Sequence, residues 1–162
     1  MSPTETILQQ LLNTLQNEFE TILRSYPTTY DNCPDVQAWH FGLPDLRRAS
    51  QMPLVAIDLD RQSLQTRTLG NLGVGKRERL IPAQIIIAHA HRDEEQLMRQ
   101  LLQLTDALTQ TLETITQTPH WLIQEVELAD YTPPLETETN APFIRFATLR
   151  LTIRDRHPRG MP

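Results

Sequence analysis

QIIIAHAHRDEEQLMRQLL, residues 84–102, combines two hydrophobic patterns that predict different secondary structures. Its first part contains three consecutive isoleucines, and a continuous run of β-branched apolar residues predicts a central strand that is covered on both faces. Its second part begins at Asp93, which can cap a helix whose first turn is acidic. A buried strand that runs straight into an amphipathic helix predicts a domain in which helices pack on a sheet.

The patterns on either side of this stretch predict one more helix and further strands. Ser2-Pro3-Thr4-Glu5 has the form of a capping box with proline at the first helical position, and apolar residues at gaps of three and four follow it. We therefore expect helices over about 3–25 and from Asp93 to before Pro119. Alternating or continuous apolar residues predict strands at 54–60, 66–69, 79–91, 121–129 and 143–154.

Together these elements predict the order α-β-β-β-α-β-β. This order is typical of an α+β fold, in which a mostly antiparallel sheet of four to five strands carries two main helices on one face. We expect a single domain over residues 1–156 and a flexible tail over 157–162. Four prolines predict a long irregular loop over 26–53, and Trp39 and Phe41 are expected to pin that loop to the core.

Finer predictions concern the faces of individual elements. The stripe of the second helix is expected to be widened by Met98 and Leu102. In the strand at 121–129, one face is predicted to hold Leu122, Val126 and Leu128, and the other Ile123, Glu125 and Glu127. If this strand pairs with the last one, Glu125 and Glu127 can face Arg150 and Arg154 across one sheet surface.

The chain has 162 residues, a net charge of −5 and a single cysteine, Cys33. One cysteine excludes an intrachain disulfide and a four-cysteine metal site. No stretch approaches the roughly 18 consecutive apolar residues of a membrane helix, and the N-terminus has no basic or apolar region of a secretion signal. We therefore expect synthesis in the cytoplasm and no membrane partner. The negative charge argues against a general nucleic-acid binder.

Charge is strongly segregated along the chain. Basic and acidic residues number 3 and 8 in residues 1–60, 6 and 1 in 61–92, 1 and 10 in 93–142, and 5 and 1 in 143–162. These charges can cancel within one subunit, or basic and acidic faces can meet between copies of the chain. For the second alternative the candidate interface residues are Arg67, Lys76, Arg77, Arg79, Glu125, Glu127, Glu136, Glu138, Arg150 and Arg154.

Candidates for chemistry are few. His89 and His91 are alternate residues of a predicted strand, so both imidazoles can reach one ion, and Asp93 or Glu95 could add an oxygen. A metal-binding module or enzyme that uses His89 and His91 is therefore the alternative from another functional class, although ordinary contacts explain the pair more simply. Cys33 lies in a loop without a nucleophile signature, and the glycine-rich residues 70–76 lack the ending of a phosphate loop. We predict no catalytic residue and no cofactor.

The element order and residue character of about 50–156 resemble the tail-terminator and neck proteins of long-tailed bacteriophages. The resemblance rests on Leu54-Val55-Ala56-Ile57 after a proline-rich loop and on the stretch quoted first. It rests also on Leu122-Ile123-Gln124-Glu125-Val126-Glu127-Leu128, a loop with prolines, and Ala147-Thr148-Leu149-Arg150-Leu151-Thr152-Ile153-Arg154. The 26–53 loop is the least family-like part.

The resemblance implies a structural virion protein without enzymatic activity, assembled in the host cytoplasm. Such proteins form hexameric rings at the head-proximal end of the tail, stop polymerisation of the tail tube and bind the head connector. The implied partners are further copies of the chain, the tail tube protein and the head-tail connector or adaptor, while genomic DNA passes through the ring without specific binding. A head-completion or neck adaptor protein of the same virion is the alternative within this class.

Overall fold

The computed structural model describes residues 2–46, 51–59, 79–115, 121–131 and 142–155, which form two helices and five strands. The sheet has the strand order β1-β2-β3-β5-β4, and all neighbouring strands are antiparallel except β1 and β2. The predicted α+β class and order are thereby confirmed. In chain order the elements are α1 (Pro3–Ser25), β1 (Ala38–Phe41), β2 (Leu54–Leu59), β3 (Arg79–His91), α3 (Glu94–Thr114), β4 (Trp121–Tyr131) and β5 (Phe143–Asp155).

The first strand is not the one that the sequence predicted. β1 lies inside 26–53, which was expected to be irregular throughout, whereas the predicted strand at 66–69 lies outside the described residues. β1 has only four residues and pairs in parallel with β2, so that Trp39 is opposite Val55. A strand this short between prolines has no usable periodicity, because its stability comes from a partner that is distant in sequence.

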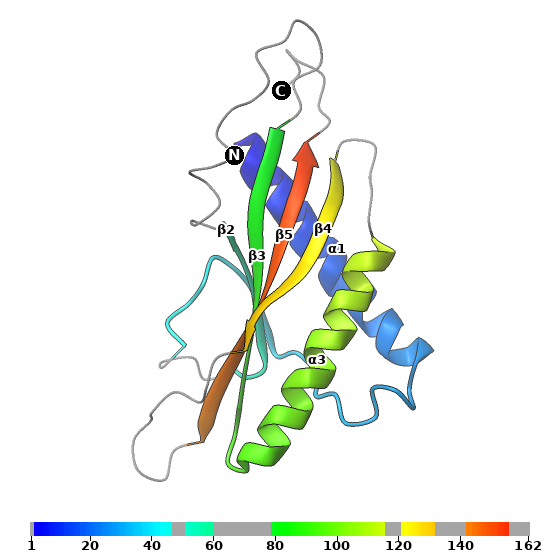
Figure 1. Ribbon diagram of the computed structural model, residues 1–162, viewed down its shortest axis with the longest axis vertical. Coiled ribbons are helices and arrows are strands. Elements are labelled where there is room, and N and C mark those ends of the chain that lie inside the picture. The colour runs from blue at the N-terminus through cyan, green and yellow to red at the C-terminus, as the bar shows by residue number, and fades with distance from the viewer. Residues whose placement is uncertain (1, 47–50, 60–78, 116–120, 132–141, 156–162) are drawn as a thin grey trace, which may run out of the picture.

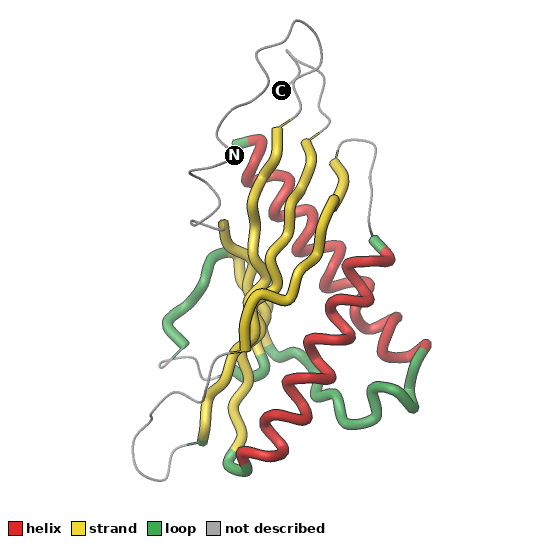
Figure 2. Tube along the Cα trace, viewed as in Figure 1, coloured by secondary structure: helices red, strands yellow, loops and turns green. Residues whose placement is uncertain are grey.

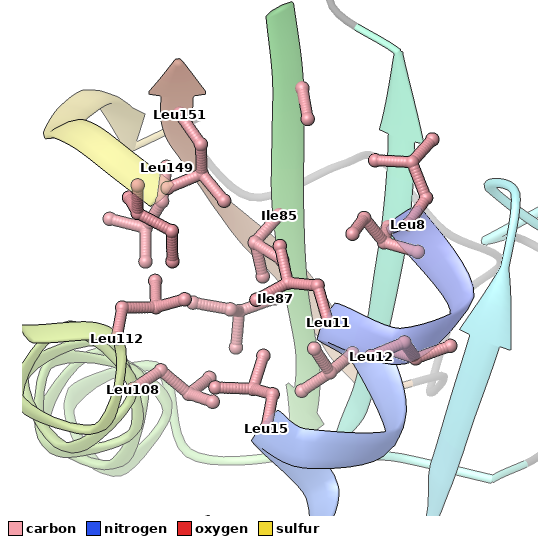
Figure 3. Packing of buried hydrophobic residues seen from close by; sticks show 14 of the residues in the cluster. Leu8, Leu11, Leu12, Leu15, Ile85, Ile87, Leu108, Leu112, Leu149 and Leu151 are labelled. Atoms are coloured by element: carbon pink, nitrogen blue, oxygen red, sulfur yellow. The ribbon is translucent and has the colours of Figure 1, made fainter. Parts of the chain in front are cut away.

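Both helices cover the same face of the sheet, as Figures 1 and 2 show. α1 begins with the predicted capping box, in which the Ser2 hydroxyl accepts from the Glu5 N–H and the Glu5 carboxylate accepts from the Ser2 N–H, both at 3.1 Å. In α3 the predicted leucine stripe is buried, but Leu102 is 37% exposed and does not widen it. Figure 3 shows Leu8, Leu11, Leu12, Leu15, Leu108 and Leu112 of the helices meeting Ile85, Ile87, Leu149 and Leu151 of the sheet.

β3 is the central strand, and its isoleucines are buried on both faces as predicted. Ile85 and Ile87 belong to the core beneath the helices, while Ile86 is buried on the opposite, helix-free face. At one end of that face a small second cluster covers the sheet, formed by Leu46 with Leu54, Ala56 and Ala88. The loop that follows β1 therefore covers part of the sheet face that the helices leave uncovered.

The two aromatic residues that were predicted to pin the 26–53 segment to the core differ from each other in burial. Trp39 packs against the main core and meets the Phe19 ring edge to face, with centroids 5.8 Å apart. Phe41 is 47% exposed, so the prediction for this residue is wrong. Phe41 is the last residue of an edge strand, and after it the chain turns at Gly42, whose φ of 86° is a conformation that favours glycine.

A bulge in β4 overturns the predicted faces of Leu122 and Ile123. The β4–β5 register shifts between Ile123 and Glu125, so Ile123 shares the core face with Val126. Leu122 instead pairs with Arg154, on the helix-free face. The extra residue breaks the alternation of two on which the prediction relied. The predicted core face of β5, with Leu149, Leu151 and Ile153 buried, is confirmed.

Candidate functional site

Polar residues are register partners across four strands of the sheet. Glu127, Arg150, Gln84 and Asp58 are successive register partners on β4, β5, β3 and β2. Gln84 and Arg150 alternate with buried core residues of their strands, so they lie opposite the helices. Arg150 is exposed, and Gln84 and Asp58 are partly exposed. Arg150 and Gln84 therefore add polar groups to the helix-free face, on which Thr148, Thr152 and Arg154 of β5 also lie.

The register bears on the predicted charge pairs of the last two strands. Glu127 lies opposite Arg150, as expected if β4 and β5 pair, but Glu125 lies opposite Thr152. Arg154 has Leu122 and Leu80 as its register neighbours. In the register, therefore, Glu127 and not Glu125 lies directly opposite an arginine.

The other candidate interface residues are distributed as follows. Arg79 is the first residue of β3 and lies opposite Asp155, a buried acid at the end of β5. Asp155 is the one acidic residue of the basic segment 143–162. The candidates that lie outside the described residues are Arg67, Lys76, Arg77, Glu136 and Glu138. The structure thus places Arg79, Glu125, Glu127, Arg150 and Arg154 on strands of one sheet.

Two histidines join the end of β3 to the start of α3. His89 is 5% exposed, and its Nε2 lies 2.6 Å from the Oε1 of Gln100 on α3. His91 Nδ1 accepts a hydrogen bond from the backbone N–H of Asp93 at 2.9 Å. The Asp93 carboxylate in turn accepts from the N–H groups of Glu95 and Gln96 at the first turn of the helix. β3 and α3 are therefore joined by side-chain hydrogen bonds as well as by the backbone of Arg92 and Asp93.

The environment of His89 favours the neutral imidazole. Burial lowers the pKa of His89, the hydrogen bond to Gln100 opposes that shift, and the neighbouring His91 adds to it. Because Gln100 Oε1 can only accept, the proton of the neutral ring lies on Nε2. The buried Nδ1 then finds no hydrogen-bond partner within the described part of the chain. A second proton on this ring would therefore be placed in an apolar site without an acceptor.

The same contacts bear on the metal-binding alternative. His91 uses Nδ1 for the backbone of Asp93, and His89 uses Nε2 for Gln100, so the two rings engage separate protein groups. Within the ranges that the structure describes, no three His, Cys, Asp or Glu side chains form a group that could hold a metal ion. The ordinary interpretation of this histidine pair, as contacts at the end of a strand, accounts for both rings.

Cys33 and its surroundings form a packing site. Burial, with a smaller contribution from Asp35, raises the pKa of the Cys33 thiol to about 12. The thiol is therefore protonated near neutral pH and is a poor nucleophile. His40 lies on the edge strand β1.

A stripe of glutamines on α3 holds the segment before Cys33, and sequence reasoning missed it. Gln103 Oε1 accepts from the Asn32 N–H at 3.0 Å, and Gln96 Oε1 accepts from the Asn32 side chain at 3.3 Å. The Tyr30 hydroxyl donates to Gln110. Residues 96, 103 and 110 repeat at seven, a spacing that keeps them on one helix face. The repeat was visible in the sequence, but nothing in it indicated which segment the glutamines would bind.

A comparison with models of known protein families found no match, and none of the curated proteins matches the sequence. Neither α1 nor α3, the helices of the described residues, is long and apolar enough to span a membrane.

Replacing Asp93 with alanine should lower the free energy of unfolding by about 0.5–2 kcal/mol, because the first turn of α3 loses the acceptor for two backbone N–H groups. Urea denaturation followed by circular dichroism measures this change. Asp93→Asn is the matched control, since asparagine caps helices as well as aspartate does. An equal loss in both variants would mean that the negative charge, and not the cap, is what matters.

Proposed function

We propose that this protein is a structural subunit of a long-tailed bacteriophage that forms a ring at the head-proximal end of the tail. In this role it ends polymerisation of the tail tube and joins the tail to the head connector. The proposal starts from the resemblance of about residues 50–156 to tail-terminator proteins. The observation that carries it is the α-β-β-β-α-β-β order with both helices on one face of the sheet, because element order is what the resemblance rests on.

The distribution of charge and of strand edges supports self-association. A cyclic ring needs two different, complementary patches on each subunit. The sheet has unlike margins, since β1 at one margin has four residues and β4 at the other has eleven. The helix-free face carries Arg150 and Arg154 of a basic segment, while α3 and β4 belong to an acidic one. Segregated charge of this kind gives complementary patches and also discourages wrong contacts.

Size-exclusion chromatography with light scattering tests the proposal on the full chain, alone and with tail tube protein. We expect a closed oligomer near six subunits under at least one of these conditions, and rings in negative-stain images of that fraction. The partner belongs in the test because a ring subunit can remain monomeric until it meets the end of the tube. A monomer at high concentration in both conditions would contradict the proposal.

Binding to purified neighbours separates the terminator from the neck adaptor of the same virion. A tail terminator should bring down the tube protein as well as the connector, because it touches both. A head-completion adaptor should retain connector subunits and leave the tube protein in solution. The two roles are therefore distinguished by whether beads that carry this protein retain the tube protein, with beads that carry no protein as the control.

A further inference from the structure

The junction between β3 and α3 carries an inference that is independent of the proposed ring. We propose that His89, with the neighbouring His91, forms an acid-sensitive latch, which holds the first turns of α3 on the end of β3 and releases them when the buried His89 imidazole takes up a second proton. The histidine latch comprises two contacts, that of His89 with Gln100 and that of His91 with the N–H of Asp93. Figure 1 shows α3 starting beside the end of β3, where both contacts lie.

Protonation affects the two contacts in different ways. His91 accepts the Asp93 N–H through the lone pair of Nδ1, and a proton on that nitrogen removes the acceptor. His89 donates from Nε2 to Gln100, so its second proton has to go to the buried Nδ1, which has no hydrogen-bond partner in the described chain. A buried donor without an acceptor destabilises the closed arrangement, and a buried positive charge does so further.

Among the described residues, no carboxylate raises the pKa of His89. Its register partner on β5 is Arg145, a further base. The next titratable or charged groups along the chain are His91, at the end of β3, and Arg92 directly after it. His91 lowers the pKa of His89. The acids of α3 lie at its exposed start, where the Asp93 carboxylate accepts from two backbone N–H groups and Glu95 binds Arg99 at 2.8 Å. Glu94, the other acid of that turn, is exposed.

The release should remain local to the first half of α3. Leu97 and Leu101 are fully buried, and Leu101 belongs with Leu104, Leu108 and Leu112 to the core shared with α1 and the sheet. We expect opening of the first turns to expose Leu97 and Leu101 and to break the contacts of Gln96 and Gln103 with Asn32, while Leu104, Leu108 and Leu112 stay in the core. Burial of the two leucines favours the closed arrangement.

Hydrogen–deuterium exchange of the full chain at about pH 7.5 and about pH 5.5 tests the latch. After correction for the intrinsic pH dependence of exchange, the opening constant of amides 97–103 should rise about tenfold, because the closed state holds the His89 imidazole neutral. The sign follows from the lowered pKa of His89, because the open state binds a proton below about pH 6.5 while the closed state does not. Amides 108–114 serve as the internal reference and should change much less.

His89→Gln with His91→Asn gives a variant that cannot titrate at either position. A glutamine amide can donate to Gln100, and an asparagine oxygen can accept the Asp93 N–H, so both contacts remain available without a titratable ring. We expect the pH response of amides 97–103 to disappear in this variant. His40→Gln on β1 is the control and should respond as the unmodified protein does.

Two results would overturn the latch. One is an opening constant for amides 97–103 that is unchanged between the two pH values in the unmodified protein. The other is a pH response of the same size in the double variant, which would assign the titration to another group. If the double variant is unfolded by circular dichroism, His89→Gln alone replaces it, and it should lose the pH response of amides 97–103.

Discussion

We expect Trp121→Ala to lower the free energy of unfolding by about 3–5 kcal/mol, the largest single effect in this protein. Trp121 is 1% exposed and is the first residue of β4, packed in the core between the sheet and the helices. Its indole Nε1 donates to Gln10 Oε1 of α1 at 3.2 Å. Alanine would remove the apolar surface and the link between β4 and α1 together, and it would leave a cavity.

Two further variants separate packing from the hydrogen bond. Trp121→Phe keeps most of the apolar volume and should lose roughly 1 kcal/mol for the indole contact, since Gln10 is exposed and can bond to water. Leu102→Ala, on the exposed side of α3, should change stability by no more than about 0.5 kcal/mol. Chemical denaturation measures all three. A Trp121→Ala loss no larger than that of Leu102→Ala would mean that β4 does not depend on this core contact.

The second large effect concerns assembly and rests on the proposed ring. Reversing both Arg150→Glu and Arg154→Glu should abolish closed oligomers, because the basic face of one subunit would then meet the acidic face of the next with like charge. Light scattering measures the loss, and the melting temperature establishes that the variant is folded. Arg24→Glu is a matched control, since this arginine lies on the exposed end of α1 in a surface pair with Glu20.

A charge-swapped partner makes this test specific. Glu136→Lys with Glu138→Lys alters the acidic segment of the predicted interface, and it should also fail to assemble alone. Mixing the two variants should restore rings, because in an alternating hexamer every junction again joins opposite charges. Failure of each variant alone without recovery in the mixture would count against charge pairing between subunits, even if the unmodified protein forms rings.

Much of this fold could be predicted because its elements carry local signals. These signals are patterns within a few residues of sequence. The cap at Ser2 marks where α1 begins, and the leucine stripes and the isoleucines of β3 mark faces that must be buried. β1 gave no such signal, because its partner β2 supplies the stability. The bulge near residue 124 was hidden for a related reason, since an inserted residue is defined only by the strand opposite to it.

The candidate site was predictable only in part. The spacing of His89 and His91 correctly put both on one side of a strand, but the sequence could not tell that Gln100 and the N–H of Asp93 would meet them. Those partners depend on how α3 docks on the sheet. Likewise, charge blocks indicated acidic and basic segments, while only the register revealed that Glu127 and Arg150 are neighbours within one subunit.

The single parallel pair in the sheet determines how its two margins are directed. β1 runs with β2, both oppose β3, and β4 runs with β3 because each opposes β5. The outermost strands therefore point in opposite directions. Rotation about an axis parallel to the strands preserves those directions, so in a ring with such an axis the facing margins of adjacent copies are antiparallel. That is the relation in which backbone groups pair most favourably.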